Sequence, residues 1–403
     1  MAASRTSTRL CRCTADAATR ASPRPKDTAM PQGLTDCFCR MLRADHAQWP
    51  AAYDLPSADV LDAARQEGVH LLLAAALAQS GQAESPCPTP GPTFQAVLRE
   101  EVAAELVARR ELRDVIAALA AQGVNPLVFK GAALAFTHYP FPAARPRVDV
   151  DLLMSADAAG RAASVFDGLD YARLPCTSGT FVRSQVSYGR IDRYGLEHTF
   201  DVHWQISIPQ VFANLLSLDE LAERAVALPA LGSTAHTIDP VHALTIACIH
   251  RVAHHHGEER LIWLYDIHLL AGALRASEAD QFLQTARDKS IGAVCEQGLL
   301  MARARFDTTL PEGLIQGLRQ LVARGAQEPS AVYLRQHLRK VDVLVSDLRA
   351  LPGWLPRFQL LREHVFPPAE FMRQTYRGAP RLLLPALYGW RFIEGAGGWF
   401  RKG

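Results

Sequence analysis

Acidic residues that alternate with apolar ones constrain this chain more than any other feature. The segment VDVDLLM, residues 148–154, has the two-residue period of a β-strand with two different faces. Side chains alternate along a strand, so Asp149 and Asp151 are predicted to lie side by side on one face. Val150 and Leu152 then face the core. Two like charges this close are unfavourable without a cation between them, and Mg²⁺ or Mn²⁺ accepts oxygen ligands of this kind.

A third aspartate follows in a second alternating segment, TFDVHWQI, residues 199–206. Its apolar residues share one strand face, while Asp201 and His203 share the other. If this strand lies beside the first, Asp201 joins Asp149 and Asp151 at one metal site suited to in-line attack on a phosphate. Asp201 would be either a ligand shared with the attacking hydroxyl or the base that deprotonates it. His203 would orient Asp201 or the acceptor, or would form a structural hydrogen bond.

A strand-to-helix turn precedes the first aspartates. Residues 127–130, LVFK, predict a short buried strand, and Gly131 opens an alanine-rich helix. Backbone N–H groups at a helix N-terminus favour an anion, so Lys130 and Gly131 are predicted to hold the triphosphate of a nucleotide. Arg145 and Arg147, just before the aspartates, would add positive charge for phosphate binding.

The chain has 403 residues, and its patterns divide it into four parts. Residues 1–30 are rich in Arg, Ser, Thr and Ala, as in a disordered tail, a transit peptide or a reading frame that begins before a true start at Met30. Residues 31–122 predict a helical N-terminal region, and residues 123–207 predict a small core of strands and helices. Residues 208–403 predict a mainly helical C-terminal region, in which the strand signals fade.

Helix and loop signals are clearest at four places. Residues 57–77 predict two helices, or one bent helix, with a break at Gly68. Residues 81–93 are rich in Pro, Gly and Ser and predict a loop, after which residues 94–121 predict one long amphipathic helix. The dipeptide Asp239–Pro240 predicts a helix N-cap followed by a proline at the first helical position.

Histidines are concentrated in the C-terminal region. His250 and His254 are spaced i, i+4 and would share one helix face. The histidines close to them in sequence are His255, His256 and His268. Three interpretations are open: a zinc site, a helix face that closes over the nucleotide or the acceptor with His250 and Asp266 toward the cleft, and plain packing. No Glu stands in an H-E-x-x-H position to favour zinc.

Charge and cysteine content narrow the class of protein. The formal net charge is only +2, so no global field attracts nucleic acid or a membrane, and any basic site must be local. The pairs Cys11/Cys13 and Cys37/Cys39 lack ordinary zinc-knuckle spacing, which favours reduced thiols in a cytoplasmic protein over a metal site. No run approaches the eighteen apolar residues that a membrane span needs.

Two segments resemble a known family. FKGAALAFTHYPFPAARPRVDVDLLM, residues 129–154, resembles the signature of the bacterial uncharacterised nucleotidyltransferase family, and DVHW, residues 201–204, is similar to its later Asp-x-His-Trp. The resemblance covers roughly residues 59–270. It implies an α+β fold with a small polymerase β-like core, a mixed sheet with helices, between helical N- and C-terminal regions. It also implies that the metal ligands are Asp149, Asp151 and Asp201.

The chain departs from that family pattern at two positions. Lys130–Gly131 replaces the Gly-Ser that is usual in the superfamily, and Val148 stands where Gly is favoured before the first aspartate. The Lys-Gly form is similar to that of nucleotidyltransferase toxins of abortive-infection systems, which makes an RNA acceptor conceivable.

The sequence therefore predicts a metal-dependent nucleotidyltransferase with Mg²⁺ or Mn²⁺ as cofactor and an NTP as substrate. It would transfer a nucleoside monophosphate to a hydroxyl acceptor and release pyrophosphate. The acceptor is open among a small molecule, a protein and an RNA, and the oligomeric state is not indicated. The alternative is a non-catalytic nucleotide-binding or accessory protein that retains the fold.

Overall fold

The structure is a computed structural model, and it describes most of the chain. The described residues are 33–43, 49, 56–81, 91–174, 181–253, 259–324, 328–335, 338–376 and 381–399. The predicted tail at residues 1–30, with Cys11 and Cys13, lies outside them, as do His254, His255 and His256.

A seven-stranded mixed sheet forms the centre of the described chain, in the order β3-β4-β5-β2-β1-β7-β6. Its strands are β1 (Leu127–Val128), β2 (Val150–Leu153), β3 (Ala172–Arg173), β4 (Gln185–Ile191), β5 (Glu197–His203), β6 (Val226–Ala227) and β7 (His236–Thr237). Two pairs, β2 with β5 and β1 with β7, are parallel, and the other four are antiparallel. The predicted α+β class with a mixed sheet is confirmed.

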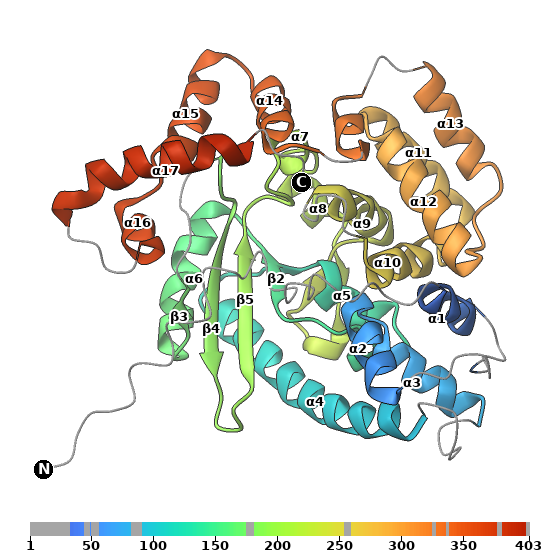
Figure 1. Ribbon diagram of the computed structural model, residues 1–403. Coiled ribbons are helices and arrows are strands. Elements are labelled where there is room, and N and C mark those ends of the chain that lie inside the picture. Colours follow the sequence, from blue (N-terminus) through green and yellow to red (C-terminus); the bar gives the residue numbers. More distant parts are fainter. Residues whose placement is uncertain are drawn as a thin grey trace, which may run out of the picture.

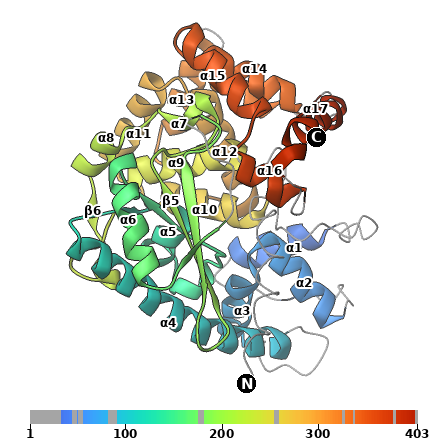
Figure 2. The same ribbon diagram turned by 90° about the vertical axis from the view of Figure 1, so that its left-hand side faces the viewer.

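The two alternating segments form the neighbouring strands β2 and β5. Phe200, Val202 and Leu152 are buried on one side of the sheet. They pack there with Phe166 of α6 (Ala156–Gly168) and with residues of the long helix α4 (Gly91–Ala121). Figures 1 and 2 show α4 running from the N-terminal helices to this side of the sheet. The opposite faces of β2 and β5, which carry the polar residues, are thereby left to form a site.

The N-terminal helices follow the predicted pattern with one shifted boundary. They are α1 (Leu34–Arg43), α2 (Ser57–Glu67), α3 (His70–Gln79) and α4. Gly68 has a left-handed backbone, with φ of 73°, and ends α2, so two helices are confirmed and one bent helix is wrong. The predicted loop ends earlier than residue 93, because α4 already begins at Gly91; residues 82–90 lie outside the described chain.

Helices dominate after residue 207, but they do not replace strands entirely. The elements up to residue 335 are α7 (Gln210–Ala213), α8 (Leu218–Glu223), α9 (Pro240–Ala253), α10 (Leu261–Gly272), α11 (Ala276–Asp288), α12 (Gly292–Phe306) and α13 (Leu314–Arg324), with short 3-10 turns at Pro229–Leu231 and Pro329–Leu334. The two-residue strands β6 and β7 were not predicted, because a strand this short has no readable period.

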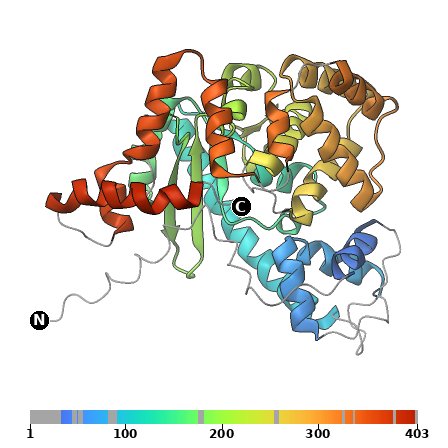
Figure 3. The same ribbon diagram turned by 45° about the horizontal axis from the view of Figure 1, so that its top comes forward.

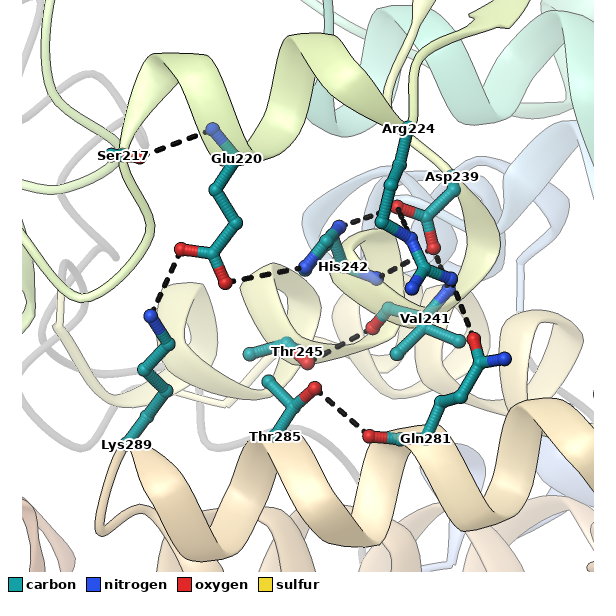
Figure 4. Close-up of polar contacts among 10 residues, drawn as sticks. All are labelled: Ser217, Glu220, Arg224, Asp239, Val241, His242, Thr245, Gln281, Thr285 and Lys289. Carbon is teal, nitrogen blue, oxygen red and sulfur yellow. Dashed lines mark hydrogen bonds and ion pairs between the residues drawn. The ribbon is translucent and has the colours of Figure 1, made fainter.

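A buried polar network fixes α9 against its neighbours (Figure 4). Oδ1 of Asp239 accepts the Val241 N–H at 3.0 Å, which confirms the predicted N-cap. The His242 ring contacts Asp239 on one side, and its Nε2 lies 3.8 Å from Oε1 of Glu220 of α8. Glu220 in turn pairs with Lys289, just after α11, at 2.9 Å. Three helices are thereby joined by polar side chains as well as by apolar packing.

The last helices form an arm beside β4. They are α14 (Lys340–Ala350), α15 (Trp354–Val365), α16 (Ala369–Thr375) and α17 (Leu384–Trp399), with a 3-10 turn at Arg381–Leu383. Figures 1 and 3 show this arm projecting from the rest of the molecule. Oε2 of Glu363 accepts the N–H groups of Phe181 and Val182 at 2.9 and 3.0 Å. None of the helices that the structure describes has the length and apolar character needed to cross a membrane.

Candidate metal and nucleotide site

Asp151 and Asp201 are paired across two parallel strands. In the register of β2 and β5, Asp151 stands opposite Asp201 and Leu153 opposite His203. One ligand atom from each of Asp151, Asp201 and His203 lies within 4.8 Å of the other two. Among the described residues, these three form the one such group of metal-binding side chains. The structure therefore brings together two of the three predicted aspartates and a histidine.

Asp149 lies beside this group but is not part of it. It precedes Val150, the first residue of β2, so the strand is shorter at this end than the alternating sequence predicted. Burial, together with the negative charges of Asp151 and Asp201, raises the pKa of Asp149 to about 7. The charge of Asp149 therefore interacts with the charges of both other aspartates.

Asp151 has the opposite titration behaviour. Burial alone would raise its pKa, but the charge of Lys130 and a hydrogen bond with His203 hold the pKa of Asp151 well below its ordinary value. Oδ1 of Asp151 accepts a hydrogen bond from Nζ of Lys130 at 2.7 Å and lies 2.7 Å from Nε2 of His203. Asp151 is thus the ionised carboxylate at the centre of the site.

Lys130 faces the carboxylates. It is the first residue of α5 (Lys130–Thr137), and its backbone is left-handed, with φ of 54°. This conformation is uncommon for a residue other than glycine and occurs more often at functional sites than elsewhere. The ammonium group of Lys130 provides positive charge beside the carboxylate of Asp151. The sequence predicted a phosphate contact for Lys130, and the structure shows a contact with Asp151.

Gly131 provides space for Arg145. A Cβ atom at Gly131 would lie 3.0 Å from the guanidinium carbon of Arg145. That guanidinium donates two hydrogen bonds to Asp266 of α10, each of 2.8 Å, and Asp266 also accepts a 2.6 Å bond from the Tyr139 hydroxyl. The segment leading to β2 is thereby attached to α10. Arg145 and Asp266, both predicted at the site, are bound to each other.

Arg147 is engaged elsewhere. It donates a 2.8 Å hydrogen bond to Glu105 of α4, and its guanidinium lies 5.5 Å from the centre of the Phe136 ring. The structure therefore shows Arg147 attaching the approach to β2 to α4.

The described histidines of the C-terminal region do not form a metal group. His250 lies on α9 with its ring centre 6.2 Å from that of Trp263. His268 Nδ1 lies 2.9 Å from the Thr308 hydroxyl, and burial lowers the pKa of His268. His254 is outside the described residues, so its pairing with His250 is not tested.

Cys37 and Cys39 are free and buried in α1. Burial raises the pKa of each thiol to about 11, so both thiols are protonated at neutral pH.

Sequence reasoning missed two residues of β4 and its approach. Gln185 pairs with His203 in the sheet, and its Nε2 donates to Oδ2 of Asp201 at 2.7 Å. Burial lowers the pKa of Arg183 to about 10, and the charge of Asp201 opposes this effect. The period-two pattern of QVSYGRI, residues 185–191, would have placed Gln185 on a polar strand face.

The residues present fit a divalent cation. Two carboxylates from neighbouring strands and one imidazole are an ordinary ligand set for such an ion. His203 is buried, and its Nδ1 has no hydrogen-bond partner among the described residues. One nitrogen of the ring is therefore left without a polar contact there. Mg²⁺ and Mn²⁺ both suit the carboxylates.

Comparison with known proteins agrees with this geometry. A family model described as an uncharacterised nucleotidyltransferase matches residues 56–307, which is more than half of the chain. The matched range includes every residue of the site described above and ends before the arm formed by α14 to α17. No curated protein matches the chain.

Proposed function

Because this chain belongs to the uncharacterised nucleotidyltransferase family, we propose that it transfers a nucleoside monophosphate from an NTP to a hydroxyl acceptor. The acceptor oxygen would form a bond to the α-phosphorus, the bond to the β-phosphate oxygen would break, and pyrophosphate would leave. The parallel pairing of Asp151 with Asp201 is the observation that carries the proposal. It provides two facing carboxylates with a third, Asp149, beside them.

We propose Mg²⁺ or Mn²⁺ as the cofactor, held by Asp149, Asp151 and Asp201, with His203 as a further ligand. When bound, such an ion supplies positive charge that stabilises the phosphate oxygens. Asp201 would receive the proton of the acceptor hydroxyl or serve as a ligand beside that hydroxyl. Its hydrogen bond from Gln185 supports either role, because it holds the carboxylate in one orientation.

Lys130 and Gly131 would bind the triphosphate. Three observations support this: the left-handed backbone of Lys130, the position of both residues at the N-terminus of α5, and the ammonium group at the carboxylates. Arg145 would contribute positive charge from its fixed position on Asp266, since its charge acts on Asp149. Arg147, which is bound to Glu105, would act mainly by positioning β2.

The test is incubation of the purified protein with each α-labelled NTP, Mg²⁺ or Mn²⁺ and a cell extract, followed by separation of labelled small molecules, proteins and RNA. Asp149→Ala and Asp201→Asn are expected to reduce transfer by at least about 100-fold, as when one charge-stabilising group is removed from an active site. Glu100→Gln, an exposed carboxylate of α4, is the matched control and should transfer normally. Circular dichroism checks that each variant is folded. Undiminished transfer by both aspartate variants would contradict the proposal.

A non-catalytic nucleotide-binding role is the second candidate, and the Lys130 contact favours it. The Lys130 ammonium group already neutralises Asp151, so this one carboxylate does not depend on a metal ion for its counter-charge. Calorimetry with ATP, with and without Mg²⁺, combined with the turnover assay, separates the two candidates. Binding without transfer of label would favour the second.

A further inference from the structure

Helix α15 presents an apolar stripe on its outer side. Trp354, Phe358 and Leu361 are spaced i, i+4 and i+7, so they share one helix face. Their exposed fractions are 77%, 59% and 38%, whereas Leu360, on the inner side, is 1% exposed. Leu360 packs with Leu344 and Leu351 of the same arm. The helix therefore has its own core contact, and the stripe is a second apolar face.

Arginines flank this stripe. Arg357 and Arg362 are both exposed, and their positions in the helix place them on either side of the line through Trp354, Phe358 and Leu361. Arginine side chains at the edge of an apolar face can keep their charge in water while their stems cover apolar surface. A helix with Trp, Phe and Leu on one face and arginines at its margin has the pattern of an interfacial membrane helix.

The neighbouring segments extend the apolar area. Phe366 is 60% exposed and Trp390 of α17 is 59% exposed. Both belong to a single packed unit, because the Tyr388 hydroxyl of α17 donates to the Pro367 carbonyl at 2.6 Å and the Phe366 and Tyr388 rings are 5.8 Å apart. The arm thus exposes large apolar side chains from α15, from the residue that directly follows α15, and from α17.

The charge of the arm differs from that of the rest of the chain. Residues 340–403, from the start of α14, contain ten Arg or Lys residues and five Asp or Glu residues, a net charge of +5. The whole chain has a net charge of only +2, so residues 1–339 carry −3. The basic charge is therefore local to the part of the sequence that also contains the exposed Trp, Phe and Leu residues.

We propose that this arm binds the surface of an anionic lipid bilayer, with the stripe of Trp354, Phe358 and Leu361 in the interface and the arginines at the headgroups. Leucine and phenylalanine bury favourably among acyl chains, and local positive charge attracts anionic lipid. A nucleic acid would use the arginines and aromatic rings but gain little from Leu361. A second copy would place two surfaces of net positive charge against each other. The inference concerns residues outside the family match and does not depend on the proposed transfer reaction.

The test is co-sedimentation of the full chain with vesicles of three parts phosphatidylcholine to one part phosphatidylglycerol, and with phosphatidylcholine alone. Wild-type protein should bind the anionic vesicles at least about fivefold better, and high salt should remove most of that difference. The variant W354S/F358S/L361S should lose binding by roughly tenfold. The matched control is L106S/I191S/Y194S, which changes three residues that are exposed to 64%, 58% and 63% on other elements. It should bind like the wild type.

None of the six changes removes a buried side chain, so each variant is expected to fold. Thermal unfolding checks this. Failure of the wild type to bind anionic vesicles would overturn the proposal, and so would equal binding by the α15 variant. Light scattering that shows a dimer dissociated by the α15 changes would identify a second copy as the occupant instead. Binding of single-stranded RNA that the same changes abolish, without vesicle binding, would identify a nucleic acid.

Discussion

Asp151 of β2 stands directly opposite Asp201 of β5 in a parallel strand pair, with Lys130 bound to the first of them and Gln185 to the second. A shift of the pairing by one residue would turn one carboxylate to the core face of the sheet. The buried residues Leu152 and Val202, which are also opposite each other, prevent such a shift. The apolar core thus determines the spacing of the charged site.

The facing carboxylates predict that a divalent cation stabilises the folded chain. Saturating Mn²⁺ or Mg²⁺ should raise the free energy of unfolding of the wild type by about 2–3 kcal/mol, the effect of a ligand at about 100 times its dissociation constant. Asp201→Asn should respond much less, because it loses one charged ligand. Thermal unfolding with metal and with a chelator measures both, and Glu100→Gln serves as control. An equal response of wild type and Asp201→Asn would contradict the metal site.

Lys130 predicts competition between its ammonium group and the cation for Asp151. Lys130→Asn removes the charge while tolerating the left-handed backbone. It should bind Mn²⁺ about tenfold more tightly in the absence of nucleotide, because a positive charge 2.7 Å from Oδ1 of Asp151 is gone. Lys130→Arg keeps the charge and should not show this gain. Calorimetric titration decides, and weaker binding by Lys130→Asn would mean that Lys130 supports the cation.

The Arg145–Asp266 pair predicts a large dependence of stability on both partners. Replacing either residue alone, by Arg145→Met or Asp266→Leu, should cost about 3–5 kcal/mol, because an uncompensated buried charge remains. The double variant should cost clearly less than the sum of the two, since neither charge is left buried. Urea unfolding of the four proteins completes the cycle. Additive losses would show that the two side chains contribute independently.

Asp347 predicts a pH dependence of stability. Burial raises the pKa of Asp347 to about 6, above an ordinary value of 3.8. The folded chain therefore binds more protons than the unfolded chain between about pH 4 and 6, and this group lowers the free energy of unfolding as pH rises through that window.

Asp347→Asn stays neutral and can still accept the Gln210 N–H bond, which is 2.7 Å long. Compared with the wild type, it should gain about 1–3 kcal/mol of stability between pH 4 and 7. Urea unfolding at several pH values measures the difference. A constant difference across the range would refute the role of this carboxyl group.

Much of the fold was predictable from local patterns. The alternating segments around Asp151 and Asp201 form strands, the dipeptide Asp239–Pro240 begins a helix, and Gly68 ends one. Each of these signals depends on residues within a few positions of one another. Strands β6 and β7 were missed because they have only two residues each.

The predicted site was less complete, because its contacts join distant parts of the chain. Asp151 and Asp201 were predicted to meet, and they do. His203 joins their group in place of Asp149 because of the parallel register of β2 and β5. The sequence does not specify this register. The contact of Lys130 with Asp151 depends on one side-chain conformation, and no periodic pattern indicates it.

The separation of Arg145 from Asp266 has a consequence for synthesis on the ribosome. Asp266 follows Arg145 by 121 positions in the sequence. Asp149, Asp151 and Asp201 are therefore all translated before Asp266, the carboxylate that pairs with Arg145. Until α10 emerges, the guanidinium beside Gly131 lacks its partner Asp266, and the approach to β2 is not attached to that helix. A nascent chain therefore contains Asp149, Asp151 and Asp201 before the segment that leads to β2 has its final attachment to α10.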